Sequence, residues 1–194
     1  GGCHSARAIT CAGPQDGAGA VELCKQAAND QDWGVVSAQW VRADGTPTNA
    51  SQQMGILTTF GTNNLPRAGA RLLGLSSGRA RTPGQTGACG SASCQGTGLG
   101  TPPTGYPQNA PGCDISEAIY DDVGLELELR APTNATGYKF DFKFYSFEYA
   151  EWVCTTFNDQ FMALVNPAPP GALDGNISFG ANGAPVSVNI AFFD

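Results

Sequence analysis

Oxygen-bearing side chains gather in the sequence immediately after a run of aromatic residues. Calcium takes six to eight oxygen ligands from carboxylates, side-chain amides and backbone carbonyls, so residues of this kind are candidate calcium ligands. The candidates are Asp121, Glu148, Glu151, Asn158 and Asp159, with Asp122 as an alternative to its neighbour. Calcium is the one cofactor that these residues suggest.

A structural role also explains the same residues. In an unbroken strand Glu148 and Glu151 face opposite sides, so their carboxylates converge only where the chain bends between them. The Asn-Asp pair at 158–159 can instead form a turn, while the glutamates are solvated or pair with Lys139 or Arg130. Both interpretations stay open at this point.

The residue types argue against most catalytic mechanisms. The single histidine, His4, lies near the start of the chain, whereas Ser-His-Asp, Cys-His and histidine-ligated zinc mechanisms need a positioned imidazole. A carboxylate pair, as in glycoside hydrolases, is the surviving alternative, and Glu148 and Glu151 would form it. Because they lack the acid-apolar-acid alternation that places two carboxylates on one strand face, we expect a protein that is not an enzyme.

Three aromatic residues, Tyr145, Tyr149 and Trp152, lie close to these acids in the sequence. Aromatic faces and carboxylates are the groups that sugars meet in binding proteins, so a glycan-binding, lectin-like module is an alternative function. Packing in a hydrophobic core explains such aromatic residues as well.

Seven cysteines in 194 residues predict disulfide bonds and an oxidising compartment. Zinc is the alternative, but the cysteines lack paired CxxC spacing and the chain has one histidine. Cys89 and Cys94 can close a small loop, and Cys11 and Cys24 flank a short predicted helix at 18–28. The connectivity stays open, and the odd count leaves one cysteine without a partner in this chain. The disulfide candidates are Cys3, Cys11, Cys24, Cys89, Cys94, Cys113 and Cys154.

Composition favours an all-β protein and excludes two kinds of partner. Charged residues make up only 14% of the chain, which has 26 glycines and 13 prolines, a balance typical of turn-rich β proteins. A net charge of -7 with no basic cluster excludes nucleic acid as a partner. No apolar run reaches the roughly 18 residues of a membrane-spanning helix, so we expect no transmembrane segment.

Short apolar runs between Gly, Pro and Asn turns predict a single domain over residues 1–194, an antiparallel β-sandwich or jelly roll. Along 124–130 the leucines are expected to face inward while Glu126, Glu128 and Arg130 face outward. Along 138–144 three phenylalanines alternate with charged residues and are expected to enter the core. The predicted strands are 33–41, 55–60, 71–75, 124–130, 138–144, 157–165, 176–179 and 185–194.

The segment 78–113 interrupts this pattern. It is rich in Gly, Thr, Ser, Pro and Gln and has hardly any large apolar residue. Loops of this length inside a compact domain are uncommon, and the cysteines within it predict that disulfides pin it down. It is either a solvated insertion or a loop that contacts a partner.

Several short motifs from about residue 33 onward carry a family resemblance. They are GIL at 55–57 with FG at 60–61, PRAG at 66–69, LSSG at 75–78, YDD at 120–122, FDFKFYSFEYAEWVCTTFND at 140–159, and DGNISF at 174–179 with PVSVN at 185–189. On these motifs the chain resembles the choice-of-anchor L family of bacterial secreted and surface proteins, in its cysteine-containing, myxobacterial version. The resemblance implies an exported β-sandwich that is tethered to, or released from, the cell surface.

Two departures from the family pattern bear on function. Many members have Ser-Glu-Glu-Tyr where this chain has Ser146-Phe147-Glu148-Tyr149, so Phe147 replaces an acid. The family pattern also runs on past PVSVN, which implies that this sandwich lacks its C-terminal strands. We therefore expect a missing C-terminal segment or a neighbouring subunit to complete the fold at an exposed sheet edge and to pair with the odd cysteine.

Together these observations predict a non-enzymatic extracellular or cell-surface module with a structural or adhesive role. It is expected to assemble with copies of itself, with its missing segment or with another chain. A glycan-binding module is the alternative, followed by a carboxylate-based glycoside hydrolase.

Overall fold

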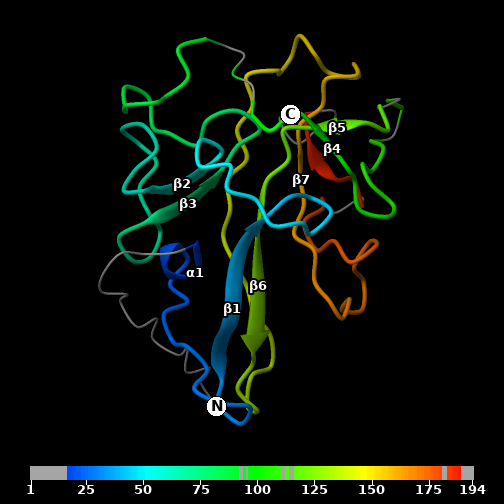
Figure 1. The fold of residues 1–194 in the computed structure, drawn as a ribbon. Helices are drawn as coiled ribbons and strands as arrows, with labels where there is room; N and C mark the ends of the chain where they lie inside the picture. The colour runs from blue at the N-terminus through cyan, green and yellow to red at the C-terminus, as the bar shows by residue number, and fades with distance from the viewer. Residues whose placement is uncertain are drawn as a thin grey trace. The chain divides into compact units, whose positions relative to one another are not determined.

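A computed structural model describes residues 17–91, 94, 96–110, 112–113, 116–180 and 183–188. The described residues form one short helix and several short strands, and the strands pair in twos (Figure 1). These elements are α1 (Gly17–Ala20), β1 (Gly34–Val41), β2 (Met54–Leu57), β3 (Leu72–Leu75), β4 (Leu99–Gly100), β5 (Ile119–Tyr120), β6 (Gly124–Arg130), β7 (Gln160–Phe161) and β8 (Val186–Ser187). The mostly non-helical chain agrees with the all-β prediction.

The strands pair in twos: β1 with β6, β2 with β3, β4 with β5, and β7 with β8. The chain forms two compact units, of which the first contains residues up to 98 together with 120–141, and the second contains 99–119 together with 142 onward. This division does not test the prediction of one domain over 1–194, which stays a prediction.

The longest ladder joins β1 and β6, and its register places Trp40 opposite Leu125 and Ala38 opposite Leu127. A bulge between Val35 and Ser37 shifts the register near the end of the ladder. The predicted alternation holds at 125–128, where the leucines are half-buried and the glutamates are exposed. The burial predicted for Leu129 is wrong, because 51% of its surface is exposed.

Close backbone approach shapes the first unit. A Cβ atom at Gly17 would lie 2.7 Å from Leu125 Cδ1, so α1 packs closely on the half-buried face of the β1–β6 ladder. A Cβ atom at Gly55 in β2 would lie 2.3 Å from the carbonyl oxygen of Ala80, so the chain at Ala80 packs closely on the β2–β3 pair. Glycine is therefore required at these two contacts for steric reasons.

The core of the second unit is small and partly polar. Val186 and Val188 are fully buried, and so are Asn176 and Ser187. Asn176 Oδ1 accepts hydrogen bonds from the backbone amides of Ala163 (3.1 Å) and Ser178 (2.9 Å). Buried amides of this kind need such partners, because each unsatisfied group would cost free energy on folding.

The prediction of a core strand at 138–144 is wrong. This segment belongs to no ladder, and Phe140 and Phe142 are exposed, Phe140 over 47% of its surface. Alternation selects two faces for an extended chain, but a strand also needs a neighbour for its backbone hydrogen bonds. Phe142 instead stacks on Phe161, with ring centroids 4.6 Å apart.

Other predicted elements are present in shortened form. The predicted strand 157–165 is reduced to β7, the last predicted strand to β8 within the described residues, and 176–179 to isolated bridges at Asn176 and Phe179. The predicted helix at 18–28 ends at Ala20, since Glu22 adopts a left-handed backbone with φ of 63°. Among the described residues, no helix has the length and apolar character needed to cross a membrane.

Two disulfides involve cysteines of the segment 78–113. Cys89 and Cys94 are bonded to each other, and Cys113 is bonded to Cys154 in the aromatic block. Cys24 is also disulfide-bonded. The remaining candidates, Cys3 and Cys11, lie outside the described residues. The chain is thus a disulfide-bonded protein, in agreement with an oxidising environment.

Candidate functional site

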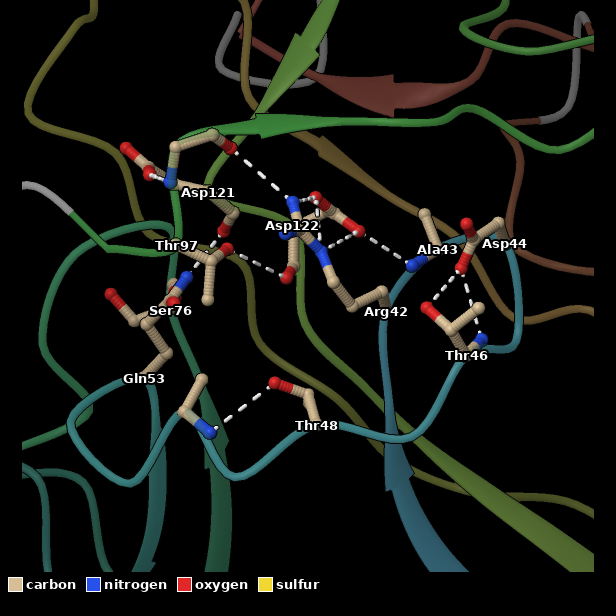
Figure 2. A network of polar contacts seen from close by, with 12 residues as sticks. Arg42, Ala43, Asp44, Thr46, Thr48, Gln53, Ser76, Thr97, Asp121 and Asp122 are labelled. Carbon is tan, nitrogen blue, oxygen red and sulfur yellow. Dashed lines mark hydrogen bonds and ion pairs between the residues drawn. The ribbon is translucent and has the colours of Figure 1, made fainter.

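A network of charged and polar groups lies in the first unit around Arg42, at the end of β1 (Figure 2). Its guanidinium donates to both carboxylate oxygens of Asp122, with 3.2 Å from Nε to each oxygen. The backbone amide of Ala43 donates to the same carboxylate at 2.6 Å. Bidentate pairing of this kind is among the stronger charge-assisted contacts in proteins.

The charge state of Asp122 is fixed by these partners. Only 10% of the Asp122 side chain is exposed, and this burial acts to raise the pKa of its carboxyl group. The hydrogen bonds from Arg42 and Ala43, together with the Arg42 charge, outweigh burial and lower the pKa below its ordinary value. The same pair raises the pKa of Arg42, so both partners stay ionised over the physiological range.

Gln53 extends the network toward β2. The residue is 1% exposed, and its Nε2 donates to the carbonyl oxygens of Ser76 (3.2 Å) and Asp121. The carboxylate of Asp121 accepts from the backbone amide of Gly98. Asp121, proposed from the sequence as a calcium ligand, is therefore part of a structural clamp (Figure 2). The clamp connects strand ends and loops, and its groups satisfy one another.

Sequence reasoning missed this network. Arg42 and Gln53 lie in no motif, and they are far from Asp122 in the sequence. In the sequence each is only a polar residue at the end of a strand in a chain with few charges. That position does not show which residue it contacts.

A second group of polar side chains lies in the second unit and contains three of the proposed calcium ligands. Glu148 Oε2 and Asn158 Oδ1 are buried oxygen atoms without a hydrogen-bond partner. Asp159 lies close enough to Glu148 for its charge and its backbone amide to act on that carboxyl. Glu151, the fourth residue of the prediction in this block, is exposed.

The pKa of Glu148 is raised from its ordinary value, first by burial and second by the negative charge of Asp159. A hydrogen bond from the Asp159 backbone acts in the opposite direction without reversing the shift. Such a carboxyl is easier to protonate, and a cation beside it would relieve the same unfavourable charge. Two acids and one amide make a small ligand set, and within the described residues no three His, Cys, Asp or Glu side chains are grouped to hold a metal ion.

The aromatic residues near these acids are exposed. The exposed set is Tyr145, Phe147, Tyr149, Trp152 and Phe157. Phe147, which replaces the acid of the family pattern, is the extreme case, with 87% of its surface exposed. Trp152 and Phe157 contact each other edge to face, with ring centroids 5.1 Å apart. A part of each of these rings is therefore exposed to solvent, so packing in a hydrophobic core does not fully account for this set.

Comparisons of the chain with models of known protein families, with curated proteins and with solved structures found no match. The resemblance to the choice-of-anchor L family stays a prediction from the motifs.

Replacement of Asp122 tests the clamp. Asp122→Ala leaves the Arg42 guanidinium without its carboxylate, so we expect the free energy of unfolding at pH 7 to fall by about 2–3 kcal/mol. Because the folded-state pKa of Asp122 is lowered, its contribution is present above the unfolded pKa of about 3.9 and is lost as the pH falls through the folded value. Urea unfolding curves at pH 7 and in the acid range measure both effects.

The matched control is Asp141→Ala. Asp141 forms an exposed ion pair with Arg67, with 80% of the arginine side chain and 53% of the aspartate side chain accessible. Its loss should cost at most about 1 kcal/mol. Equal losses for the two variants would show that the clamp contributes no more than a surface pair.

Proposed function

We propose that the chain is an exported, non-enzymatic structural or adhesive module that assembles with another polypeptide at the outer edge of β6. The observation that carries the proposal is the state of this edge. Among the described residues β6 pairs with β1 alone, so its other side presents backbone groups that no strand covers. An uncovered strand edge accepts an extended segment of another chain by backbone hydrogen bonding.

The side chains of β6 support an edge that accepts a partner. Soluble proteins protect exposed edges with charged side chains, above all lysine, with proline, with bulges or with very short strands. β6 is a long strand of the sequence GLELELR, with no lysine and no proline, and its Leu129 is exposed. A strand added here would cover that leucine and complete a larger sheet, as a β-sandwich requires.

The cysteines and the family resemblance support an exported protein. Disulfides such as Cys89–Cys94 and Cys113–Cys154 form and persist in oxidising compartments. The motifs that resemble choice-of-anchor L proteins suggest a location outside the cell or at its surface. A sandwich completed by a further segment or subunit agrees with the two-stranded sheets of the described chain.

A single substitution at the edge tests the proposed assembly. Leu129→Lys places a charge where the added strand would pack, so we expect larger species to dissociate to monomers in sedimentation velocity. Leu65→Lys is the matched control, because Leu65 is also exposed but lies outside every strand. A wild-type protein that remains monomeric at every concentration measured would refute assembly through this edge.

A glycan-binding module is the second candidate, favoured by the exposed aromatic residues of the 145–157 block. Rings such as Trp152 and Tyr149 offer apolar faces to sugars, and Glu151 beside them is an exposed hydrogen-bond acceptor.

A glycan array separates the candidates. For a lectin, we expect binding that Trp152→Ala reduces at least about tenfold, while Tyr120→Ala, an exposed aromatic outside this block, leaves it unchanged. Hydrolysis of the bound glycan would indicate the carboxylate-based enzyme instead. No signal on the array removes both.

Calcium binding at Glu148, Asn158 and Asp159 remains a proposal, supported by the two buried oxygen atoms that lack partners. Calorimetric titration of the wild-type protein with calcium should release or absorb heat, whereas Asp159→Ala should give none. Binding should weaken as the pH falls, because protons compete for a carboxyl whose pKa is already raised. Glu151→Gln is the control and should bind as the wild type does; identical heats in wild type and Asp159→Ala would contradict the site.

A further inference from the structure

The Cys89–Cys94 disulfide lies next to the clamp of the first unit. Cys94 packs against Gly78, since a Cβ atom at Gly78 would lie 2.9 Å from the carbonyl oxygen of Cys94. Gly78 in turn donates its amide to the hydroxyl of Ser76 at 3.0 Å. The carbonyl oxygen of Ser76 accepts from Gln53 of the clamp. The disulfide therefore attaches Cys94 to the chain beside the clamp.

The residues that follow Cys94 lie on the clamp. A Cβ atom at Gly96 would clash with the side-chain amide of Gln53, so the backbone here packs directly on that buried side chain. Gly98 exchanges two hydrogen bonds with Asp121. Its amide donates to the Asp121 carboxylate, and its carbonyl oxygen accepts from the Asp121 amide at 2.8 Å.

Residues 96–98 also contact the ion pair of the clamp. The carbonyl oxygen of Gly98 accepts from Arg42 Nη2 at 3.3 Å. The hydroxyl of Thr97 donates to the carbonyl oxygen of Asp122 at 3.5 Å (Figure 2). These three residues thus contact all four members of the clamp, and they begin two positions after a cysteine that the disulfide holds in place.

The disulfide can be reached by a reductant at Cys89, which is exposed. Thiol–disulfide exchange requires that a thiolate approach a sulfur atom of the bond, and exposed disulfides are among the labile ones. We propose that Cys89–Cys94 is a redox-sensitive switch for the clamp: the intact bond keeps residues 96–98 on the clamp, and reduction by a dithiol releases them. The switch lies within the first unit and does not depend on assembly at β6.

The redox step balances with a dithiol as the only other reactant. One thiolate of the dithiol attacks the Cys89 sulfur, the Cys89–Cys94 bond breaks, and Cys94 leaves as a thiolate. The second thiolate of the dithiol attacks the mixed disulfide and releases Cys89, so the reductant becomes a cyclic disulfide. Two electrons pass to the cysteine pair, and the two protons of the dithiol end on the two cysteine thiols.

Reduction should open the clamp locally and leave the unit folded. A disulfide restricts the unfolded chain less when its loop is short, and five positions separate Cys89 from Cys94 whereas 41 separate Cys113 from Cys154. The β1–β6 ladder does not include residues 96–98. Loss of the bond therefore acts on the contacts of these residues, as in local opening rather than global unfolding.

Amide hydrogen exchange, followed residue by residue by NMR, tests the proposal. In the oxidised wild-type protein the Gly98 and Asp121 amides should exchange slowly, because both are hydrogen-bonded. Excess dithiothreitol should accelerate their exchange at least about tenfold, and reoxidation with the cyclic disulfide of the same reagent should reverse the change. Cys89→Ser/Cys94→Ser should show the fast exchange without reductant, and reductant should not change it further.

The matched control is Cys113→Ser/Cys154→Ser, which removes the other disulfide. Its Gly98 and Asp121 amides should exchange slowly without reductant and respond to dithiothreitol as the wild type does. A reference amide distinguishes local opening from unfolding. The Ala27 amide donates to the carbonyl oxygen of Val35 at 2.9 Å, at the end of β1 away from Arg42. Without reductant, its exchange in Cys89→Ser/Cys94→Ser should equal that of the wild type.

Three results would overturn the switch. One is slow exchange of Gly98 and Asp121 in Cys89→Ser/Cys94→Ser, which would show that the clamp does not need the bond. Another is a response to dithiothreitol that disappears in Cys113→Ser/Cys154→Ser, which would assign the effect to the other disulfide. Equal acceleration at Ala27 and Gly98 in Cys89→Ser/Cys94→Ser would show that the bond stabilises the whole unit.

Discussion

The bidentate contact between Arg42 and Asp122 is the interaction on which the first unit depends. It joins the end of β1 to the residues that lead into β6, and these are the two strands of the longest ladder. Gln53 and Asp121 connect the same region to the start of β2. Two-stranded sheets have little stability by themselves, so side-chain contacts of this kind must set the positions of the strands. A partly buried ion pair is suited to this because its geometry tolerates few alternatives.

The second unit also has only short strands, but other contacts stabilise it. Its strands β7 and β8 contain two residues each, and among its described residues the buried set includes the polar Asn176, Ser178 and Ser187 beside Val186 and Val188. Asn176 supplies hydrogen bonds that a longer ladder would otherwise provide, and the Cys113–Cys154 bond restrains the aromatic block. Disulfides favour the folded state chiefly by restricting the unfolded chain, so they complement a small core.

The sequence predicted the parts of the fold that local pattern determines. The strands β1, β2, β3 and β6 lie where apolar runs stand between turn residues, and Cys89–Cys94 was foreseeable from the short loop between its cysteines. The Arg42–Asp122 clamp was not, because nothing local identifies a partner so distant in the sequence. The error at 138–144 has the same origin, since alternation predicts the faces of a strand but not its neighbour. The proposed calcium ligands stay a prediction, and the sequence could not separate them by environment: Glu148 and Asn158 have buried oxygen atoms without partners, whereas Asp121 accepts a hydrogen bond and Glu151 is exposed. Burial and partners of this kind depend on tertiary structure.

The open edge of β6 follows from the shortness of the ladders in the described chain. Covering large apolar side chains and pairing backbone groups lowers the free energy of a protein, and a chain with short ladders leaves some of both exposed. Scattered exposed residues are ordinary on protein surfaces, but an uncovered strand without a protective lysine or proline is not. Negative selection against nonspecific association would be expected to remove such an edge unless a partner covers it. In the proposed assembly, the alternation of charge along β6 would make that cover selective, because an apolar edge alone would accept many strands, whereas Glu128 and Arg130 favour opposite charges in a fixed order.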